Sequence, residues 1–127
     1  MLKKVKEILD KRSKINDEDD YRIEKCRDEL IDALSQDELL TIDILNQLNE
    51  KEILYTSEVF EEIAYNLQSV NYINCLKYIE KKYPSLDIKD AIEVGYTLGF
   101  KKTLKSVIEI IAEKKLILMW FKYDTSP

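Results

Sequence analysis

The chain has 127 residues, a formal net charge of −5, and only two glycines and two prolines. A chain of this length forms a single domain (residues 1–127), and so few turn residues disfavour a β-sandwich and favour an all-α fold with short connections. Histidine is absent, which removes the commonest general base and metal ligand, so we expect no catalytic site, metal or cofactor.

The N-terminal segment is predicted to form a helix over residues 2–14. Its first ten residues mix lysines and acids without an apolar core, unlike a secretory signal. No run of about 18 apolar residues occurs anywhere, so the sequence predicts a cytoplasmic protein without a membrane span. Helical spacing places Val5, Ile8, Leu9, Arg12 and Ile15 on one stripe, which should dock residues 1–15 on the other helices as a cap.

A second helix is predicted to begin at Asn16 or Asp17, with Glu18, Asp19 and Asp20 in its first turn. Acids at that position complement the positive end of the helix dipole. Two alternatives are a surface for a partner and a carboxylate magnesium site made by Asp17, Asp19 and Asp20. The spacing lacks the glycine and the terminal glutamate of a calcium-loop motif.

The next two helices are predicted from capping signals. Ser35 and Glu38 have the spacing of a capping box, which predicts a third helix that ends near Asn49. Thr56 and Ser57 supply an N-cap for a fourth helix. The buried positions of the third helix are predicted to be Leu39, Ile42, Leu45 and Leu48, and those of the fourth Val59, Phe60, Ile63 and Leu67.

A fifth helix is predicted from Asn71, and Pro84 ends it because proline disfavours the helical conformation of the preceding residue. A sixth helix, capped by Ser85 or Asp87, contains Gly95. Glycine there costs about 1 kcal/mol relative to alanine, which predicts close packing against a neighbouring helix. The core positions of a seventh helix are predicted to be Leu104, Val107, Ile108 and Ile111.

The last segment, residues 115–127, is predicted to cap the C-terminal end of the domain. Residues 116–121 are six consecutive apolar residues, so they need covering. They are compatible with a continued helix or with a terminal strand, because periodicity carries no information when every position is apolar. Trp120 is interpreted as a structural residue of this cap.

A spacing of 31 residues recurs between residues 22 and 114. It separates Ala33, Ala64 and Gly95, each placed before a helix. Apolar positions recur at the same offset, as in Ile42, Ile73 and Leu104, and in Leu45, Leu76 and Val107. The pattern predicts three stacked antiparallel helix pairs, a short α-solenoid with repeats at 22–52, 53–83 and 84–114. An irregular all-α domain with evenly sized helices is the alternative.

Charge is distributed unevenly. Residues 1–15 carry a net +4, residues 16–64 hold sixteen acids against four bases, and residues 65–127 carry a net +3. We hypothesise that a basic protein meets the acidic half. Helical spacing also exposes Tyr78, which would supply an interface anchor. The candidate partner-binding residues are Asp17, Glu18, Asp19, Asp20, Glu24, Asp28, Glu61, Glu62 and Tyr78.

Other classes of site have weaker signals. Cys26 and Cys75 lack metal-ligand spacing and are interpreted as free thiols, with a disulfide between them as the alternative. Lysines at positions 101, 102, 105, 114 and 115 are read as a solvated helix face, since the chain has only three arginines. We therefore expect no nucleic acid, membrane or small-molecule substrate.

The 31-residue helix pairs resemble HEAT-, ankyrin- and tetratricopeptide-type solenoids in period, without their sequence signatures. In size, acidity and lack of catalytic groups, the chain is similar to small all-α immunity proteins of bacterial contact-dependent or polymorphic toxin systems. That resemblance implies a cytoplasmic protein that neutralises a basic toxin nuclease domain by blocking its active site with carboxylates and aromatics. A helical-repeat adaptor or regulatory subunit, and a small acidic-site enzyme, are the alternatives.

Overall fold

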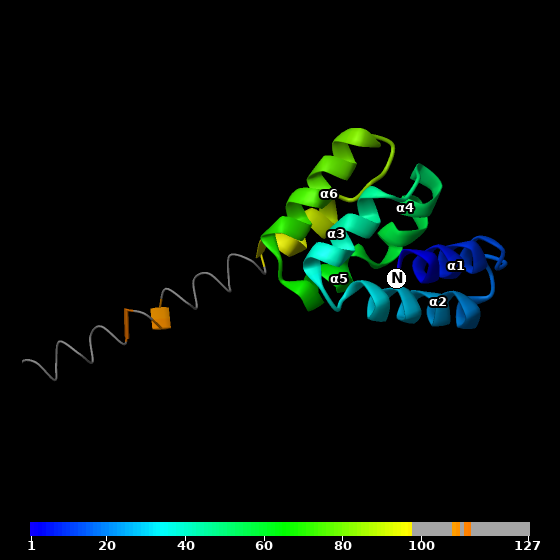
Figure 1. The fold of residues 1–127 in the computed structure, drawn as a ribbon, viewed down its shortest axis with the longest axis horizontal. Helices are drawn as coiled ribbons and strands as arrows, with labels where there is room; N and C mark the ends of the chain where they lie inside the picture. The colour runs from blue at the N-terminus through cyan, green and yellow to red at the C-terminus, as the bar shows by residue number, and fades with distance from the viewer. Residues whose placement is uncertain (98–107, 110, 113–127) are drawn as a thin grey trace, which may run out of the picture.

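The computed structural model describes residues 1–97, 108–109 and 111–112, and within them it is helical without a β-strand (Figure 1). The prediction of an all-α fold is confirmed. Residues 89–97 form a further helical stretch after a turn at Pro84. The preceding elements are α1 (Leu2–Ser13), α2 (Asp20–Leu34), α3 (Glu38–Asn46), α4 (Glu50–Thr56), the 3-10 turn η1 (Ser57–Val59), α5 (Phe60–Leu67) and α6 (Val70–Lys82). No helix in these ranges is both long and apolar enough to span a bilayer.

Helix α1 docks as its stripe predicts. Val5, Ile8, Leu9 and Arg12 are buried, and the helix packs against α2 and α4. The predicted start of the second helix is wrong, because α2 begins at Asp20. Residues 16–18 form a turn, which the Asn16 side chain closes by accepting from the Glu18 amide at 2.9 Å.

Asp19 is the residue that caps α2. Its carboxylate accepts a hydrogen bond from the Arg22 amide at 3.2 Å. A short acceptor ahead of the first turn satisfies one of the amides that every helix start leaves unpaired. The acids in this region therefore divide into Asp17 and Glu18 in the turn, the cap at Asp19, and Asp20 in the first turn of α2.

The boundaries between residues 35 and 59 differ most from the prediction. Asp37, and not Ser35, caps α3, by accepting from the amides of Leu39 and Leu40. The helix ends at Asn46, three residues before the predicted end. A capping box then forms at Asn49 and Glu52 and opens α4, a helix that the sequence interpretation missed.

Thr56 and Ser57 do not open a helix as predicted. Thr56 ends α4, and its hydroxyl bonds back to the Glu52 carbonyl at 2.8 Å. Residues 57–59 form η1, after which α5 continues, so residues 50–67 are helical with one change of winding. The later boundaries are closer to the prediction: α6 is capped by Ser69 and begins at Val70, one residue before the expected start, and it ends two residues before Pro84.

Helices that are one predicted repeat apart lie side by side (Figure 1). Helix α2 packs on η1 and α5, and α3 packs on α6. Polar contacts join equivalent places in successive units: Asn66 donates to Ser35 at 3.0 Å, and Asn71 donates to Glu38 at 3.5 Å. The partners are 31 and 33 residues apart. Within the described residues, these contacts thus join neighbouring helices at separations close to the predicted period of 31 residues.

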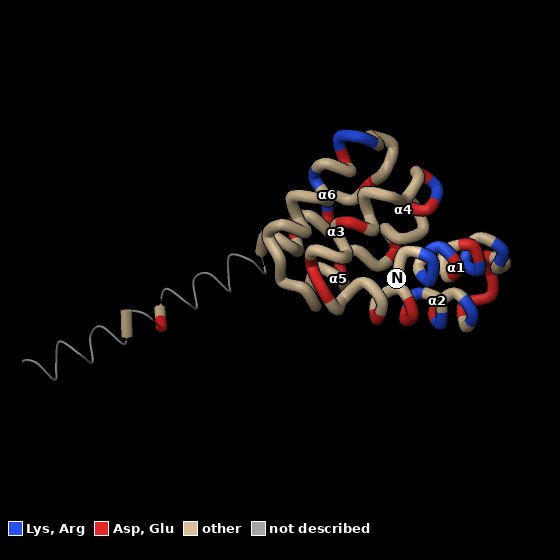
Figure 2. Tube along the Cα trace, in the orientation of Figure 1, with Lys and Arg blue, Asp and Glu red and all other residues tan. Residues whose placement is uncertain are grey.

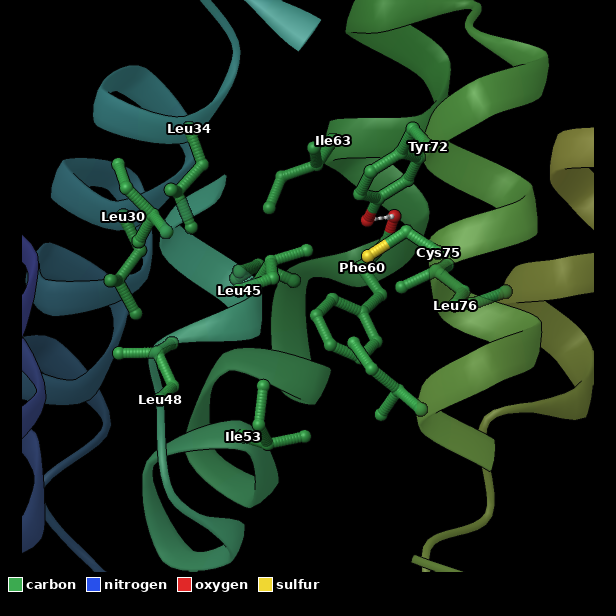
Figure 3. Packing of buried hydrophobic residues seen from close by; sticks show 14 of the residues in the cluster. Leu30, Leu34, Leu45, Leu48, Ile53, Phe60, Ile63, Tyr72, Cys75 and Leu76 are labelled. Atoms are coloured by element: carbon green, nitrogen blue, oxygen red, sulfur yellow. Dashed lines mark hydrogen bonds between the residues drawn. The ribbon is translucent and has the colours of Figure 1, made fainter. Parts of the chain in front are cut away.

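Buried apolar side chains from all of these helices form one core (Figure 3). The equivalent residues Leu45 and Leu76 are both buried, and the buried Tyr72 donates its hydroxyl hydrogen to the Phe60 carbonyl at 2.9 Å. The repeat is imperfect, because Ile42 is only partly buried whereas Ile73, its equivalent 31 residues later, is buried. Ile63 and Val94 are also 31 residues apart, yet Ile63 is buried and Val94 is exposed.

Three more apolar positions are exposed against expectation. Leu39, predicted to lie in the core, is exposed on α3. Ile108 and Ile111 are helical but also exposed, because no described part of the chain covers them. The remaining predictions for this end, at Leu104, Val107, residues 113–127 and the lysines at 101, 102, 105, 114 and 115, lie outside the described residues.

Gly95 packs closely against α6, as its place within a helix predicted. A β-carbon there would lie 2.5 Å from Ile73 Cγ1, collide with Ile73 Cδ1, and stand 3.8 Å from the Ala64 β-carbon. Helix propensity alone would make Gly95→Ala stabilising by about 1 kcal/mol. We expect instead a loss of about 1–3 kcal/mol in the free energy of unfolding, because the buried Ile73 must shift.

Urea denaturation measures this effect. Ile73→Val removes the Cδ1 atom, so the double variant with Gly95→Ala should lose less stability than the two single losses added together. A Gly95→Ala variant more stable than the wild type would contradict the close contact.

Candidate partner-binding surface

The acidic residues predicted to bind a partner lie along α2 and α5 instead of at one point. Asp17 projects from the α1–α2 turn, with its side chain 94% exposed and 3.9 Å from Arg12 Nη1. Glu18 is exposed in the same turn. The Asp19 carboxylate caps α2 and also forms an ion pair with the Arg22 side chain at 3.4 Å. Only part of this first cluster is therefore available to a partner.

A line of acids follows on the outer side of α2. Asp20, Glu24, Asp28 and Asp32 are spaced four residues apart and are all exposed, so they share one face of the helix. We call these four residues the α2 acidic ridge. Figure 2 shows acidic segments recurring along α2, beside the more basic α1. Asp32 was missed by the sequence interpretation, although its spacing from Asp28 identifies it.

One member of the ridge is neutralised within the chain. Glu24 Oε1 accepts from Arg27 Nη1 at 2.7 Å.

Glu61 and Glu62 are exposed in the first turn of α5, just after Glu58, which reaches Arg27 on α2. The α5 acids thus lie on a separate helix that packs against α2.

Glu58 takes part in a partly buried ion network that joins α1, η1 and α2. It accepts from Arg12 Nη2 at 2.8 Å and Nε at 3.2 Å, and from Arg27 Nε at 3.1 Å. The Arg12 guanidinium is 5.1 Å from the Tyr55 ring centre. Burial lowers the pKa of Arg27, but hydrogen bonds to Glu58 and Glu24 outweigh it and raise the pKa overall. This network joins α1, η1 and α2 and pairs the Glu58 carboxylate within the chain.

A groove of about 590 Å³ runs between α3 and α6. Two large side chains project at its margins: Leu39 is 68% exposed and Tyr78 is 60% exposed. The expectation that Tyr78 is exposed while Tyr72 is buried is confirmed. The residues that line the groove are Leu39, Ile42, Asn46, Asn71, Cys75, Tyr78 and Lys82. We call this feature the α3–α6 groove.

Helical spacing explains how the groove is built. On α3 the lining residues recur at intervals of three and four, and on α6 they do the same from Asn71 to Lys82, so each helix contributes a single face. Cys75 and Asn46 meet across the floor, with Sγ 3.9 Å from Oδ1. The mixture of apolar and amide side chains is typical of a protein interface, where aromatic anchors are surrounded by polar groups.

The two cysteines are free and buried, which confirms them as free thiols. Burial raises the pKa of Cys75 from 9.0 to about 11, and burial followed by the charge of Glu29 raises the pKa of Cys26. A low thiolate fraction makes a thiol a poor nucleophile at neutral pH. Cys75 therefore serves as a small neutral part of the groove floor.

The raised pKa of Cys75 predicts a loss of stability in alkali. Between pH 9 and 11 the unfolded thiol ionises while the folded one stays protonated, so the unfolded state binds fewer protons and stability falls as pH rises. Two pKa units correspond to about 2–3 kcal/mol. Burial also raises the pKa of Tyr72, which adds to the loss above pH 10.

Denaturation midpoints between pH 8 and pH 10 test this expectation, with Cys75→Ala as the matched variant. The variant should lose less stability than the wild type over that interval, because below pH 10 the main group left with a raised pKa is Cys26. Equal losses in both proteins would show that the Cys75 thiol does not titrate as described.

The described residues contain no group of three or more His, Cys, Asp or Glu side chains placed to hold a metal ion. Asp17, Asp19 and Asp20 consequently do not form the magnesium site considered as an alternative. What the geometry offers is an open groove between α3 and α6 and, on another helix, the α2 acidic ridge. Comparison with protein-family models, with curated proteins and with solved structures gives no match for this chain.

Proposed function

We propose that the chain is a protein-binding module that neutralises a basic partner, in the manner of a cytoplasmic immunity protein that blocks a toxin nuclease domain. The observation that carries the proposal is the α3–α6 groove, which exposes Leu39 and Tyr78 next to a strongly acidic segment. Residues 35–67, which include α3 and α5, contain eight acids and a single lysine. Glu52 and Glu58 are paired within the chain, and an exposed apolar anchor beside the remaining acids is a combination that a protein interface uses.

The two kinds of surface have separate roles in this proposal. The α2 acidic ridge and the α5 acids attract a basic protein and raise its association rate. The groove supplies the short-range contacts that set the dissociation rate, with Tyr78 and Leu39 as anchors. A toxin whose active site is rich in lysine and arginine would lose access to its nucleic acid substrate when these acids cover it.

An adaptor or regulatory subunit is the second candidate. The stacking of α2 on α5 and of α3 on α6 favours it, because stacked helix pairs present extended surfaces that suit many protein partners. The two candidates differ in the number and the nature of their partners. An immunity protein binds one toxin tightly, and its gene lies beside that of the toxin.

Co-expression with the toxin domain encoded next to this chain tests the proposed function. The wild type should restore growth and form a stable complex on size-exclusion chromatography. Leu39→Asp, in the groove, should weaken the complex about 30-fold or more, a loss of about 2 kcal/mol that is typical of an interface anchor. Leu54→Asp is the matched control, since Leu54 is 51% exposed on α4 and does not line the groove.

The control variant should bind within about threefold of the wild type, because single exposed residues outside an interface contribute little. Failure of the wild-type chain to protect cells or to bind the neighbouring toxin domain would contradict the immunity function. Equal losses of affinity from Leu39→Asp and Leu54→Asp would instead show that the groove is not part of the interface.

A further inference from the structure

We propose that the α3–α6 groove binds one amphipathic helix of about three turns from the partner, antiparallel to α3 and α6. The bound helix would carry basic residues at its C-terminal end, beside Glu38, and acidic residues at its N-terminal end, beside Lys82. This inference rests on the proposed function, since it names the element of the partner that occupies the same groove.

The shape of the groove fits a helix. Helices α3 and α6 pack side by side, with Glu38 next to Asn71 at their starts and Asn46 next to Cys75 further along (Figure 1). The lining of α6 extends from Asn71 to Lys82, about 17 Å at 1.5 Å per residue, which equals about three helical turns. A third helix packs its apolar stripe into the groove that two neighbouring helices form.

The apolar lining determines which face of the partner enters. Ile42 and Cys75 lie on the floor, and Leu39 and Tyr78 stand at the margins. A stripe of apolar residues at intervals of three and four would contact this lining over its full length. An extended peptide fits less well, because the described residues contain no strand whose edge would bond its backbone.

The charges along the groove give it a direction. Asp37 caps α3 and Glu38 follows it, whereas Lys82 and its neighbour Lys81 occupy the last turn of α6. Helix α3 contains Glu38 and Asp43 and no basic residue. The groove is therefore acidic where its two helices begin and basic where α6 ends, so it favours an occupant with the opposite polarity.

Helix dipoles select the antiparallel orientation. The amino ends of α3 and α6 lie at the acidic end of the groove, and amino ends carry partial positive charge. An antiparallel helix places its own partially negative carboxyl end there. Basic side chains in its last turn then stabilise that helix and face Glu38 at the same time. A parallel helix would need acids in its last turn, which the dipole disfavours.

A pair of synthetic peptides tests the inference directly. Both are stapled helices of about 14 residues with the same composition, the same apolar stripe and a fluorescent label. One carries glutamates in its first turn and lysines in its last, and the second has these charges exchanged. Fluorescence anisotropy with the full chain should show saturable binding of the first peptide, with the second about 10-fold weaker.

Substitutions in the groove then assign the binding. The double variant Glu38→Lys/Lys82→Glu should reverse the preference between the two peptides. Leu39→Asp should weaken both peptides about 10-fold or more, and Leu54→Asp should leave both unchanged. Circular dichroism of each variant checks that it has the helix content of the wild type.

Several outcomes would overturn the inference. Equal affinity for the two peptides would show that the groove does not select the direction of a bound helix. A lack of saturable binding of either peptide would show that the groove does not bind a helix. A wild-type dimer that Leu39→Asp converts to monomer would show that a second copy of this chain fills the groove. None of these results requires the toxin complex to fail, so they are separable from failure of the proposed function.

Discussion

Leu76→Ala is expected to lower the free energy of unfolding by about 2–5 kcal/mol. Leu76 is 0% exposed on α6 and lies in the core that Figure 3 shows, with buried residues of α3, α4 and α5 in the same cluster. Truncation removes three buried carbon atoms and leaves a cavity that helices on several sides cannot close. Urea denaturation of the two proteins measures the difference.

Leu54→Ala is the control for this substitution. It makes the same chemical change at a side chain that is 51% exposed on α4, so it should cost less than about 1 kcal/mol. A loss below about 1 kcal/mol for Leu76→Ala would contradict the described packing of α6, because a fully buried leucine cannot be removed at so small a cost.

Glu58→Ala is expected to cost about 3–5 kcal/mol, because it leaves the guanidinium of Arg12 without its main partner. The Arg12 side chain is only 8% exposed, and its remaining acid, Asp17, is 3.9 Å away in a solvated position. Arg27 loses a hydrogen bond in the same substitution. Since these groups join α1, η1 and α2, denaturation should show a cooperative loss of stability.

Two comparisons isolate the buried network. Glu29→Ala breaks the more exposed pair with Lys11, whose atoms are 3.8 Å apart, and should cost less than about 1 kcal/mol. The double variant Arg12→Met/Glu58→Leu removes both charges and should be much less damaging than Glu58→Ala alone. If Glu58→Ala costs no more than Glu29→Ala, the network does not support the fold.

Local signals predicted the helices α1 and α6 well. The apolar stripe of α1 and the proline after α6 each act within a few residues, so they are visible in the sequence. Tyr78 was correctly placed in solvent for the same reason, since helical spacing separates it from Leu76 and Ile79.

The boundaries between α2 and α5 depended on competition between similar signals. Ser35 with Glu38 and Asn49 with Glu52 both have the spacing of a capping box, and only the second pair forms one. Asp37 displaces Ser35 because its carboxylate reaches two amides at once. Sequence spacing shows which residues are able to cap a helix, while the packing of the chain decides which of them do.

The candidate site was predictable only in part. The acids were visible as a charge imbalance, but the sequence does not show that Asp19 caps a helix or that Arg27 pairs with Glu24 and Glu58. The α3–α6 groove needs side chains from segments about 30 residues apart to meet, which a local pattern does not predict. Leu39 was placed in the core because it continues the helical spacing of Ile42, Leu45 and Leu48, but the first turn of α3 projects into solvent and both Leu39 and Leu40 are exposed there.

Exposed acids on this chain are proposed to attract a basic partner protein. The most direct test is the rate of association with the toxin domain proposed as that partner, measured at low and at physiological salt. The test variant is Asp20→Lys/Asp28→Lys/Asp32→Lys, which alters the ridge without removing the Asp19 cap or the Glu24 pair. The control Glu7→Lys/Asp87→Lys/Asp90→Lys makes the same change in net charge at exposed positions elsewhere.

At low salt the ridge variant should associate about 10-fold more slowly than the control, with a similar dissociation rate, because steering depends on where the charges lie. The difference should shrink at physiological salt, where exposed charges are screened beyond about 8 Å. Equal association rates for the two variants at low salt would contradict the claim and leave the ridge as a solvated helix face.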